Sequence, residues 1–121
     1  MTSVALQSNA REMKVFLNHI YEFKKGIRHM ILYTMPCKHL EFALFRLASQ
    51  SIDYFIQPLK GGRVNLFFGR KECVKAIEMM VNRPLNELTP EQDFILGAVL
   101  GYDICGQCER YLERTEKKIG S

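Results

Sequence analysis

Residues 52–68 read IDYFIQPLKGGRVNLFF and have the pattern of a β-hairpin. Apolar side chains alternate with other residues along both arms of this stretch: Ile52, Tyr54 and Ile56, then Val64, Leu66 and Phe68. A period of two is typical of strands. The arms are joined by Gly61-Gly62, and glycine readily adopts the positive φ angles of a tight hairpin turn. We therefore predict two antiparallel strands connected by this turn.

The residues before the hairpin predict a strand followed by a helix. Residues 29–34 (HMILYT) are a nearly unbroken apolar run bounded by Pro36, which suits a short strand covered on both faces. Pro36 then fits the first turn of a helix that runs to about Ser49. Phe42 and Phe45 widen the apolar stripe of this helix, so we expect it to be well buried.

Two further helices flank this block. Apolar residues recur at helical spacing over residues 13–23, and Gly26 can close that helix in a left-handed conformation. A strand over residues 14–20 is the alternative. Another helix is predicted from about Arg70, and it ends at residues 82–84, where a proline follows Asn-Arg.

The C-terminal part begins with a capping box. In Thr89-Pro-Glu-Gln92 the threonine hydroxyl can bond the backbone of Gln92 while the glutamine side chain reaches back. The residues from Pro90 to about Lys117 predict either one long helix or two helices with a break near Gly101 or Gly106.

Together these elements predict an α+β fold. A strand–helix–strand–strand–helix block resembles three quarters of a split βαβ sandwich, with a three-stranded antiparallel sheet of order 1-3-2, helices packed on it and a helical C-terminus. Residues 13–118 form one domain, and residues 1–12 predict a loose tail. The first strand is an apolar edge, which either the N-terminal segment or a second chain must cover. We expect a homodimer.

Composition narrows the function classes. The formal net charge of +4 and the absence of long basic runs disfavour nucleic-acid binding. No run has the ~20 apolar residues of a membrane helix, and the first residues lack a signal-peptide pattern, so we expect a cytoplasmic protein with no membrane partner. In that compartment we expect the four cysteines to be reduced, mostly buried thiols, with a disulfide framework as the alternative.

The most compact thiol pair is Cys105-Gly-Gln-Cys108. A redox dithiol or half of a metal site is the functional interpretation. Mid-helix residues three apart have Cβ atoms ~5–6 Å apart, whereas a disulfide needs ~3.8 Å. Both thiols fall on a helical stripe with Ala98, Tyr102 and Leu112, so we predict buried core; only a helix starting at Cys105 would favour the redox role.

Gly97, Gly101 and Cys105 repeat at four-residue spacing and form a strip of small residues. Each helical glycine costs ~1 kcal/mol against alanine, so some benefit should offset this cost. We predict close helix packing at Gly97 and Gly101; a kink at Gly101 is the alternative.

Two other positions carry candidate chemistry. Cys37 precedes a helix with His39 two residues on, a possible thiol nucleophile and base, although a solvent-facing histidine is the commoner case. Arg70 and Lys71 open a helix, where free N–H groups attract anions, although solvated charges are the commoner case. The histidines have no metal-ligand spacing, and we expect no metal or cofactor.

Three segments resemble a small family of bacterial proteins of unknown function: VFLNHIYEFKK (residues 15–25), VNLFFGRKEC (64–73) and LGYDICGQCERYL (100–112). The resemblance implies an α+β homodimer, frequently encoded next to a flavodoxin. Family elements match Gly101, Tyr102 and Asp103, and also Gln107, Cys108, Arg110, Tyr111 and Leu112. We do not expect Cys105 to belong to this family pattern, which weakens the redox interpretation of the thiol pair.

Two hypotheses follow. The first is a non-enzymatic dimeric binding or adaptor module, whose acidic partner, a flavodoxin, meets Lys60, Arg63, Arg70 and Lys71. The second is a small thiol- or metal-dependent enzyme using Cys37 or Cys108. We favour the first because no residues pair a nucleophile, a base and an orienting group, so no catalytic residue is assigned.

Overall fold

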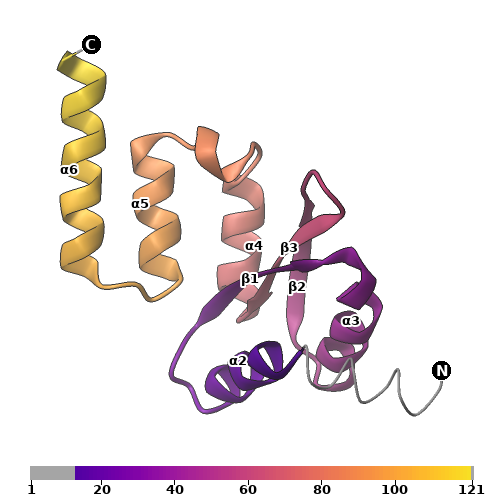
Figure 1. The fold of residues 1–121 in the computed structure, drawn as a ribbon. Coiled ribbons are helices and arrows are strands. Elements are labelled where there is room, and N and C mark those ends of the chain that lie inside the picture. The colour runs from indigo at the N-terminus through magenta and orange to yellow at the C-terminus, as the bar shows by residue number, and fades with distance from the viewer. Residues whose placement is uncertain (1–12, 121) are drawn as a thin grey trace.

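The computed structural model describes residues 13–120, and their side chains as far as residue 117 (Figure 1). The tail predicted over residues 1–12 lies outside the described residues. Helices and strands follow in the order α2 (Lys14–Lys24), β1 (Met30–Pro36), α3 (Leu40–Ser49), β2 (Asp53–Pro58), β3 (Arg63–Gly69), α4 (Lys71–Met80), α5 (Pro90–Val99) and α6 (Ile104–Gly120). Short 3₁₀ turns span Cys37–His39 and Leu85–Glu87.

The three strands form one antiparallel sheet of order β1-β3-β2, which confirms the predicted α+β fold and topology. Leu66 of β3 is paired with Tyr33 of β1 on one side and Ile56 of β2 on the other. The hairpin between β2 and β3 is also confirmed. Gly61 and Gly62 both have positive φ angles, +74° and +69°.

The central strand β3 is covered on both faces by apolar cores. Leu66 and Phe68 point to the core under α2 and α3, whereas Phe67 points to the core under α4 and α5. Figure 1 shows these two helix pairs on opposite sides of the sheet. Alternation of side chains along one strand therefore explains both layers.

The first helix is α2, so the alternative strand over residues 14–20 is wrong. α2 packs on a face of the sheet, where the ring of Phe16 lies 5.8 Å from that of Tyr33. Among the described strands, none pairs with the outer edge of β1.

α3 differs in two respects from the prediction. Pro36 is the last residue of β1, and a 3₁₀ turn separates it from the first residue of α3, Leu40. The expectation that Phe45 helps bury α3 is wrong, because its side chain is 71% exposed. The buried positions of α3 are Ala43 and Leu47, on the opposite side of the helix.

The C-terminal part is two helices, and the alternative of one long helix is wrong. α5 begins at the predicted capping box, with Thr89 N–H donating to Gln92 Oε1 (3.0 Å) and Gln92 N–H donating to Thr89 Oγ1 (3.1 Å). It ends just before Gly101, whose φ of +81° turns the chain. α4, α5 and α6 stand side by side, with α6 outermost (Figure 1).

Within residues 13–120, none of the helices combines the length and the apolar character that crossing a membrane requires.

Candidate functional site: a pocket between β1, α5 and α6

A cavity of about 420 Å³ lies between β1, the loop before α5, α5 and the first turns of α6. This volume is typical of sites for small molecules, which have ~300–1,000 Å³. Its apolar lining comes from β1, the loop before α5 and α5 itself: Leu32, Leu85, Leu88, Leu96 and Leu100. Its polar side chains are Asp93, Tyr102, Gln107 and Arg110, together with Asn86.

An ion-pair cluster closes one side of this pocket. Arg110 donates from Nε to Asp93 Oδ2 (2.7 Å) and from its Nη2 to Asp93 Oδ1 (3.3 Å). Arg114 Nη1 lies 3.2 Å from Asp93 Oδ1, and its Nη2 donates to the carbonyl of Leu88 (3.0 Å). The hydrogen bond with Asp93 raises the pKa of Arg110 above its ordinary value, with the charge of the same carboxylate adding to the effect. These three side chains together carry a net positive charge.

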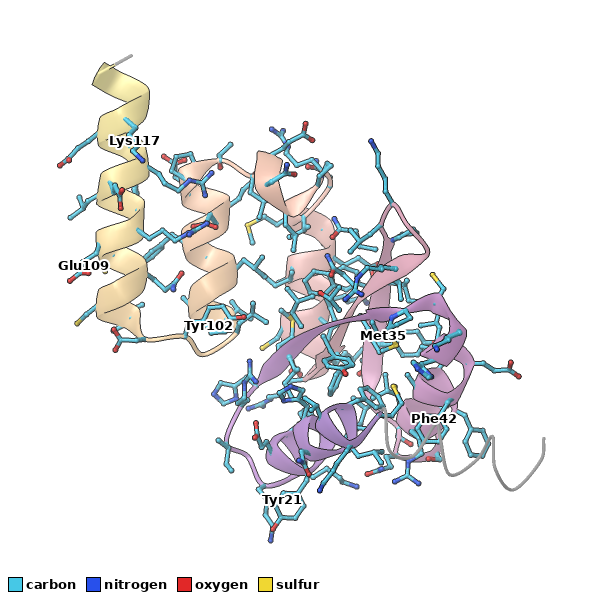
Figure 2. All side chains as sticks on the ribbon, in the orientation of Figure 1. Tyr21, Met35, Phe42, Tyr102, Glu109 and Lys117 are labelled. Carbon is cyan, nitrogen blue, oxygen red and sulfur yellow. The ribbon has the colours of Figure 1, made fainter. Side chains whose placement is uncertain are left out.

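Gln107 enters the pocket because Gly97 leaves room for it. A Cβ atom at Gly97 would collide with the side-chain amide of Gln107. The loop between the helices fixes this contact: Tyr102 N–H donates to the carbonyl of Gly97 (3.1 Å), and Asp103 Oδ2 accepts from the N–H of Gly106 (2.8 Å) at the start of α6. Figure 2 shows Tyr102 in this loop, at the end of α5.

The pocket can bind a molecule by shape and polarity. Leucines offer an apolar floor, while the Arg110 guanidinium and the Tyr102 and Gln107 side chains offer hydrogen-bond donors at its rim. The side chains lining it include neither a cysteine nor a histidine.

The site prediction from sequence omitted the pocket residues Asp93, Gln107 and Arg110. A signal was present, because Gln107, Arg110 and Arg114 are three and four residues apart and fall on one helix face. The segment of the family resemblance also contains Tyr102, Gln107 and Arg110, which the structure brings together in this pocket.

A second, wider groove of about 840 Å³ runs along β2 and the loop after α4. It contains the predicted binding residue Lys60, with Arg83, Glu78 and Glu87. Gln57 Nε2 donates across it to the carbonyl of Arg83 (3.1 Å).

The structure does not bring the four predicted basic residues together. Arg63 starts β3 and Arg70 follows its end, so seven residue steps of ~3.3 Å separate them by ~23 Å. Lys60 lies with Arg63 at the hairpin end, whereas Lys71 lies with Arg70 at the other end. Arg70 Nε is also 3.8 Å from Glu72 Oε2.

Cys37 is exposed, and its N–H donates to the carbonyl of Gly62 (2.8 Å). His39 is only 4% exposed, so the expectation of a solvent-facing histidine is wrong. The 3₁₀ turn holds both residues, but it directs one to solvent and the other to the interior.

The prediction that Cys105 and Cys108 are buried core residues is also wrong, because both are exposed. The physical reason is the break at Gly101. A continuous helix would place them in line with Ala98 and Tyr102, but α6 starts anew at Ile104 and presents another face to α5.

The two glycines of the predicted packing strip have different roles. Gly97 is buried against Gln107 of α6, which is a close helix approach. Gly101 has open space where a Cβ would lie and a positive φ instead, so the kink is the correct alternative there.

The outer side of the α5–α6 pair is exposed and mostly apolar, with the carboxylate of Glu91 at its border, where Glu91 Oε1 accepts from Tyr111 Oη (3.4 Å). Helix spacing on α6 aligns Ile104, Cys108 and Leu112, with Ile104 52% and Leu112 61% exposed. Where α5 packs against α6, the Asp93–Arg110 ion pair lies on the side of the pocket, and the Phe94–Tyr111 ring contact lies on the other side. Because the stripe adjoins Tyr111, it lies on the side opposite the pocket. We call the set Phe94, Ile95, Ala98, Ile104, Cys108 and Leu112 the outer face.

Comparison with known proteins adds a family but no activity. A search of curated proteins finds no match to this chain. A family described as "Protein of unknown function (DUF2023)" matches residues 14–114, which extend from the first residue of α2 to Arg114 beside the pocket. Since this match covers most of the 121 residues, the chain belongs to that family of proteins of unknown function.

Proposed function

We propose that this protein is a non-enzymatic cytoplasmic binding module that works as a homodimer, with its outer face as the contact between two copies. The observation that carries this proposal is the stripe Ile104–Cys108–Leu112, which is apolar, uncharged and exposed. Monomeric proteins rarely expose contiguous apolar patches unless these bind something. The four described cysteines are unpaired, which agrees with a reducing compartment.

A second copy is the occupant that suits this face. Two helix pairs packed face to face form a four-helix arrangement, and a two-fold axis places the same stripe on both sides. The stripe contains no charge that would repel its own copy. α6 has 17 residues and a length of ~25 Å, and a helix pair is ~20 Å wide. These dimensions span about 500 Å², which is below the ~800 Å² per partner of a standard interface and places the contact at the small end of the range.

The surrounding charges support the placement of the contact. Glu109 and Glu113 lie on other sides of α6, and Figure 2 shows Glu109 projecting away from α5. These side chains would form the polar rim that borders interfaces of this kind.

The test is the oligomeric state of purified protein, measured by sedimentation or light scattering over a range of concentrations. Leu112→Lys should convert the dimer to a monomer, because it would place a charge in the apolar centre. Met79→Lys is the matched control, since Met79 is 82% exposed on α4 and lies outside the outer face. A wild-type protein that stays monomeric at high concentration, or a Leu112→Lys dimer, would contradict the proposal.

As its partner we propose a flavodoxin, an acidic electron-transfer protein. The family resemblance supports this partner, and so do exposed basic residues at both ends of β3. Because the two pairs are ~23 Å apart, we infer that one flavodoxin domain uses mainly one of them. Binding should weaken with salt, since exposed charges are screened over ~10 Å at 0.1 M.

Charge reversal at each end tests the partner. The Lys60→Glu, Arg63→Glu variant and the Arg70→Glu, Lys71→Glu variant are compared by calorimetry with purified flavodoxin at low and high salt. One variant should lose affinity and salt dependence, and the other should bind like wild type. Equal affinity of both variants and wild type would rule out these basic residues as the contact, and the absence of binding by wild type would remove the flavodoxin proposal. Neither outcome affects the dimer.

The second candidate is a small thiol- or metal-dependent enzyme using Cys37 or Cys108, and the exposure of both thiols favours it. It requires a thiol that alkylates rapidly at neutral pH in the native protein, or metal bound in stoichiometric amount after purification. Slow alkylation and a metal-free protein would remove it.

A further inference from the structure

The two thiols of the Cys105-Gly-Gln-Cys108 segment lie in the first turn and a half of α6. α6 begins at Ile104, so Cys105 is its second residue and Cys108 its fifth. Both side chains are exposed, and neither belongs to the apolar cores. Two accessible thiols three residues apart are therefore held on one short segment.

Helix geometry brings this pair almost to bonding distance. Side chains at i and i+3 have Cβ atoms ~5–6 Å apart, and a disulfide needs ~3.5–4.5 Å. Closing the pair needs a movement of ~1–2 Å, which a rigid helix interior would resist. The start of α6 is not such an interior, because the N–H of Cys105 has no acceptor within the helix.

The surroundings allow that movement. Gly106 lies between the thiols, and the preceding residues Tyr102 and Asp103 are non-helical. The first turn of α6 is capped by the Asp103 side chain, whose Oδ2 accepts from Gly106 N–H (2.8 Å). No apolar core needs to open when Cys105 rotates toward Cys108, since both side chains face solvent.

From this geometry we propose that Cys105 and Cys108 form a reversible two-electron redox site that exchanges with disulfides of the glutathione type. The Cys105 thiolate attacks one sulfur of oxidised glutathione, forming a mixed disulfide and releasing one glutathione thiolate. The Cys108 thiolate then attacks the Cys105 sulfur, which releases the second glutathione and closes the Cys105–Cys108 disulfide. The two cysteine thiols lose two protons and two electrons, and glutathione disulfide gains the electrons.

The proposed dimer would change the rate at this site but not its chemistry. Cys108 also belongs to the outer face, so a dimer would shield it and slow the exchange without changing the chemistry. Testing the Leu112→Lys variant beside wild type separates the two proposals, because the dithiol should close in both.

The experiment incubates the full native chain in buffers of increasing oxidised-to-reduced glutathione ratio, blocks free thiols by alkylation and analyses tryptic peptides by mass spectrometry. The sequence suits this readout. Cleavage after Lys75 and Arg110 leaves both thiols in one peptide, residues 76–110, because trypsin does not cut the Arg83-Pro84 bond. Cys37 and Cys73 fall in other peptides.

The expected result is the joint loss of both alkylation sites in peptide 76–110, with a mass lower by two hydrogens and no attached glutathione. Dithiothreitol should restore both sites. Cys105→Ser and Cys108→Ser are matched controls, since each leaves one thiol that stops at the mixed disulfide. Exposed Cys37 is an internal control for a lone thiol.

Two outcomes would overturn the proposal. In the first, peptide 76–110 keeps both thiols free at ratios that glutathionylate Cys37. In the second, wild-type peptide accumulates bound glutathione as the single-serine variants do, which would mean that the ring does not close.

Discussion

The side-chain amide of Gln107 on α6 occupies the space above Gly97 on α5 that a Cβ atom would need. This contact brings the helices together and directs Gln107 into the pocket with Arg110 and Tyr102. The glycine therefore costs helix stability and gives the pocket one of its polar side chains.

A double-mutant cycle tests this relationship. Gly97→Ala in the Gln107→Ala background should stabilise the protein by ~0.5–1 kcal/mol, because alanine favours the helix and no side chain opposes it. The same change in wild type should stabilise it less or destabilise it, since Gln107 must move. Urea unfolding of the four proteins measures the coupling. Additive effects would show that the two residues do not compete for this space.

Asp93 should contribute to stability through its two arginine partners. Its side chain is only 16% exposed, so Asp93→Asn should cost ~1–2 kcal/mol in the free energy of unfolding. Arg114→Met should cost more than Arg110→Met, because Arg114 is less exposed and also bonds the Leu88 carbonyl. Urea unfolding at low and high salt measures these costs, and equal costs would contradict the ranking.

The raised pKa of Arg110 determines how its ion pair with Asp93 contributes to the free energy of unfolding as the pH changes. A basic group with a raised pKa contributes stability that is fully present below its ordinary pKa and is lost as the pH rises through the raised value. Arg110 should therefore add no pH dependence between pH ~5 and ~9, since an arginine titrates above ~12. The measurement is the difference in unfolding free energy between wild type and Arg110→Met across this range. A difference that changes within it would assign the pH dependence to another group.

A row of polar side chains crosses the sheet at one register position, and its centre is buried Asn65. Thr34 Oγ1 donates to Asn65 Oδ1 (2.6 Å), and Asn65 Nδ2 donates to Gln57 Oε1 (2.9 Å). Asn65→Leu should cost ~1–3 kcal/mol, because it leaves both neighbours without these partners. Asn18→Leu, on the exposed side of α2, is the control and should stay within ~0.5 kcal/mol. Thermal unfolding of both variants measures the difference, and equal stability would mean that water replaces the row.

The sheet and the capping box could be predicted because their signals are local. The Gly61-Gly62 turn joins strands that are adjacent in sequence, and Thr89 and Gln92 are three residues apart. Each pattern contains most of the interactions that stabilise it. Pairing of β1 with β3 then followed from the block order of the split βαβ plan.

The environment of α6 could not be predicted in the same way. A periodic pattern indicates that two helix faces differ, but it does not say which one another element covers. Here the covered face carries Gln107, Arg110 and Arg114, while Ile104 and Leu112 point outward. The break at Gly101 determines which face of α6 turns toward α5. The sequence alone could not decide whether this break falls at Gly101 or at Gly106. Similarly, the four basic residues are near in sequence but lie at opposite ends of an extended strand.

Gly69, at the end of β3, should tolerate no side chain. A Cβ there would lie 2.7 Å from Met30 Cα and would also collide with the His29 carbonyl oxygen, and both are backbone atoms of the neighbouring strand region. Its φ of +153° adds conformational strain. Gly69→Ala should therefore destabilise the protein by about 3 kcal/mol or more.

Gly61→Ala is the matched control for this position. It has a φ of +74° but open space around the added carbon, so only the conformational cost of ~1 kcal/mol applies. Urea unfolding of the two variants compares a backbone collision with backbone strain alone. Similar costs would mean that β1 shifts away from Gly69 without loss of pairing. A larger cost at Gly69 would show that the pairing of Met30 with Gly69 fixes the position of the edge strand that lines the pocket.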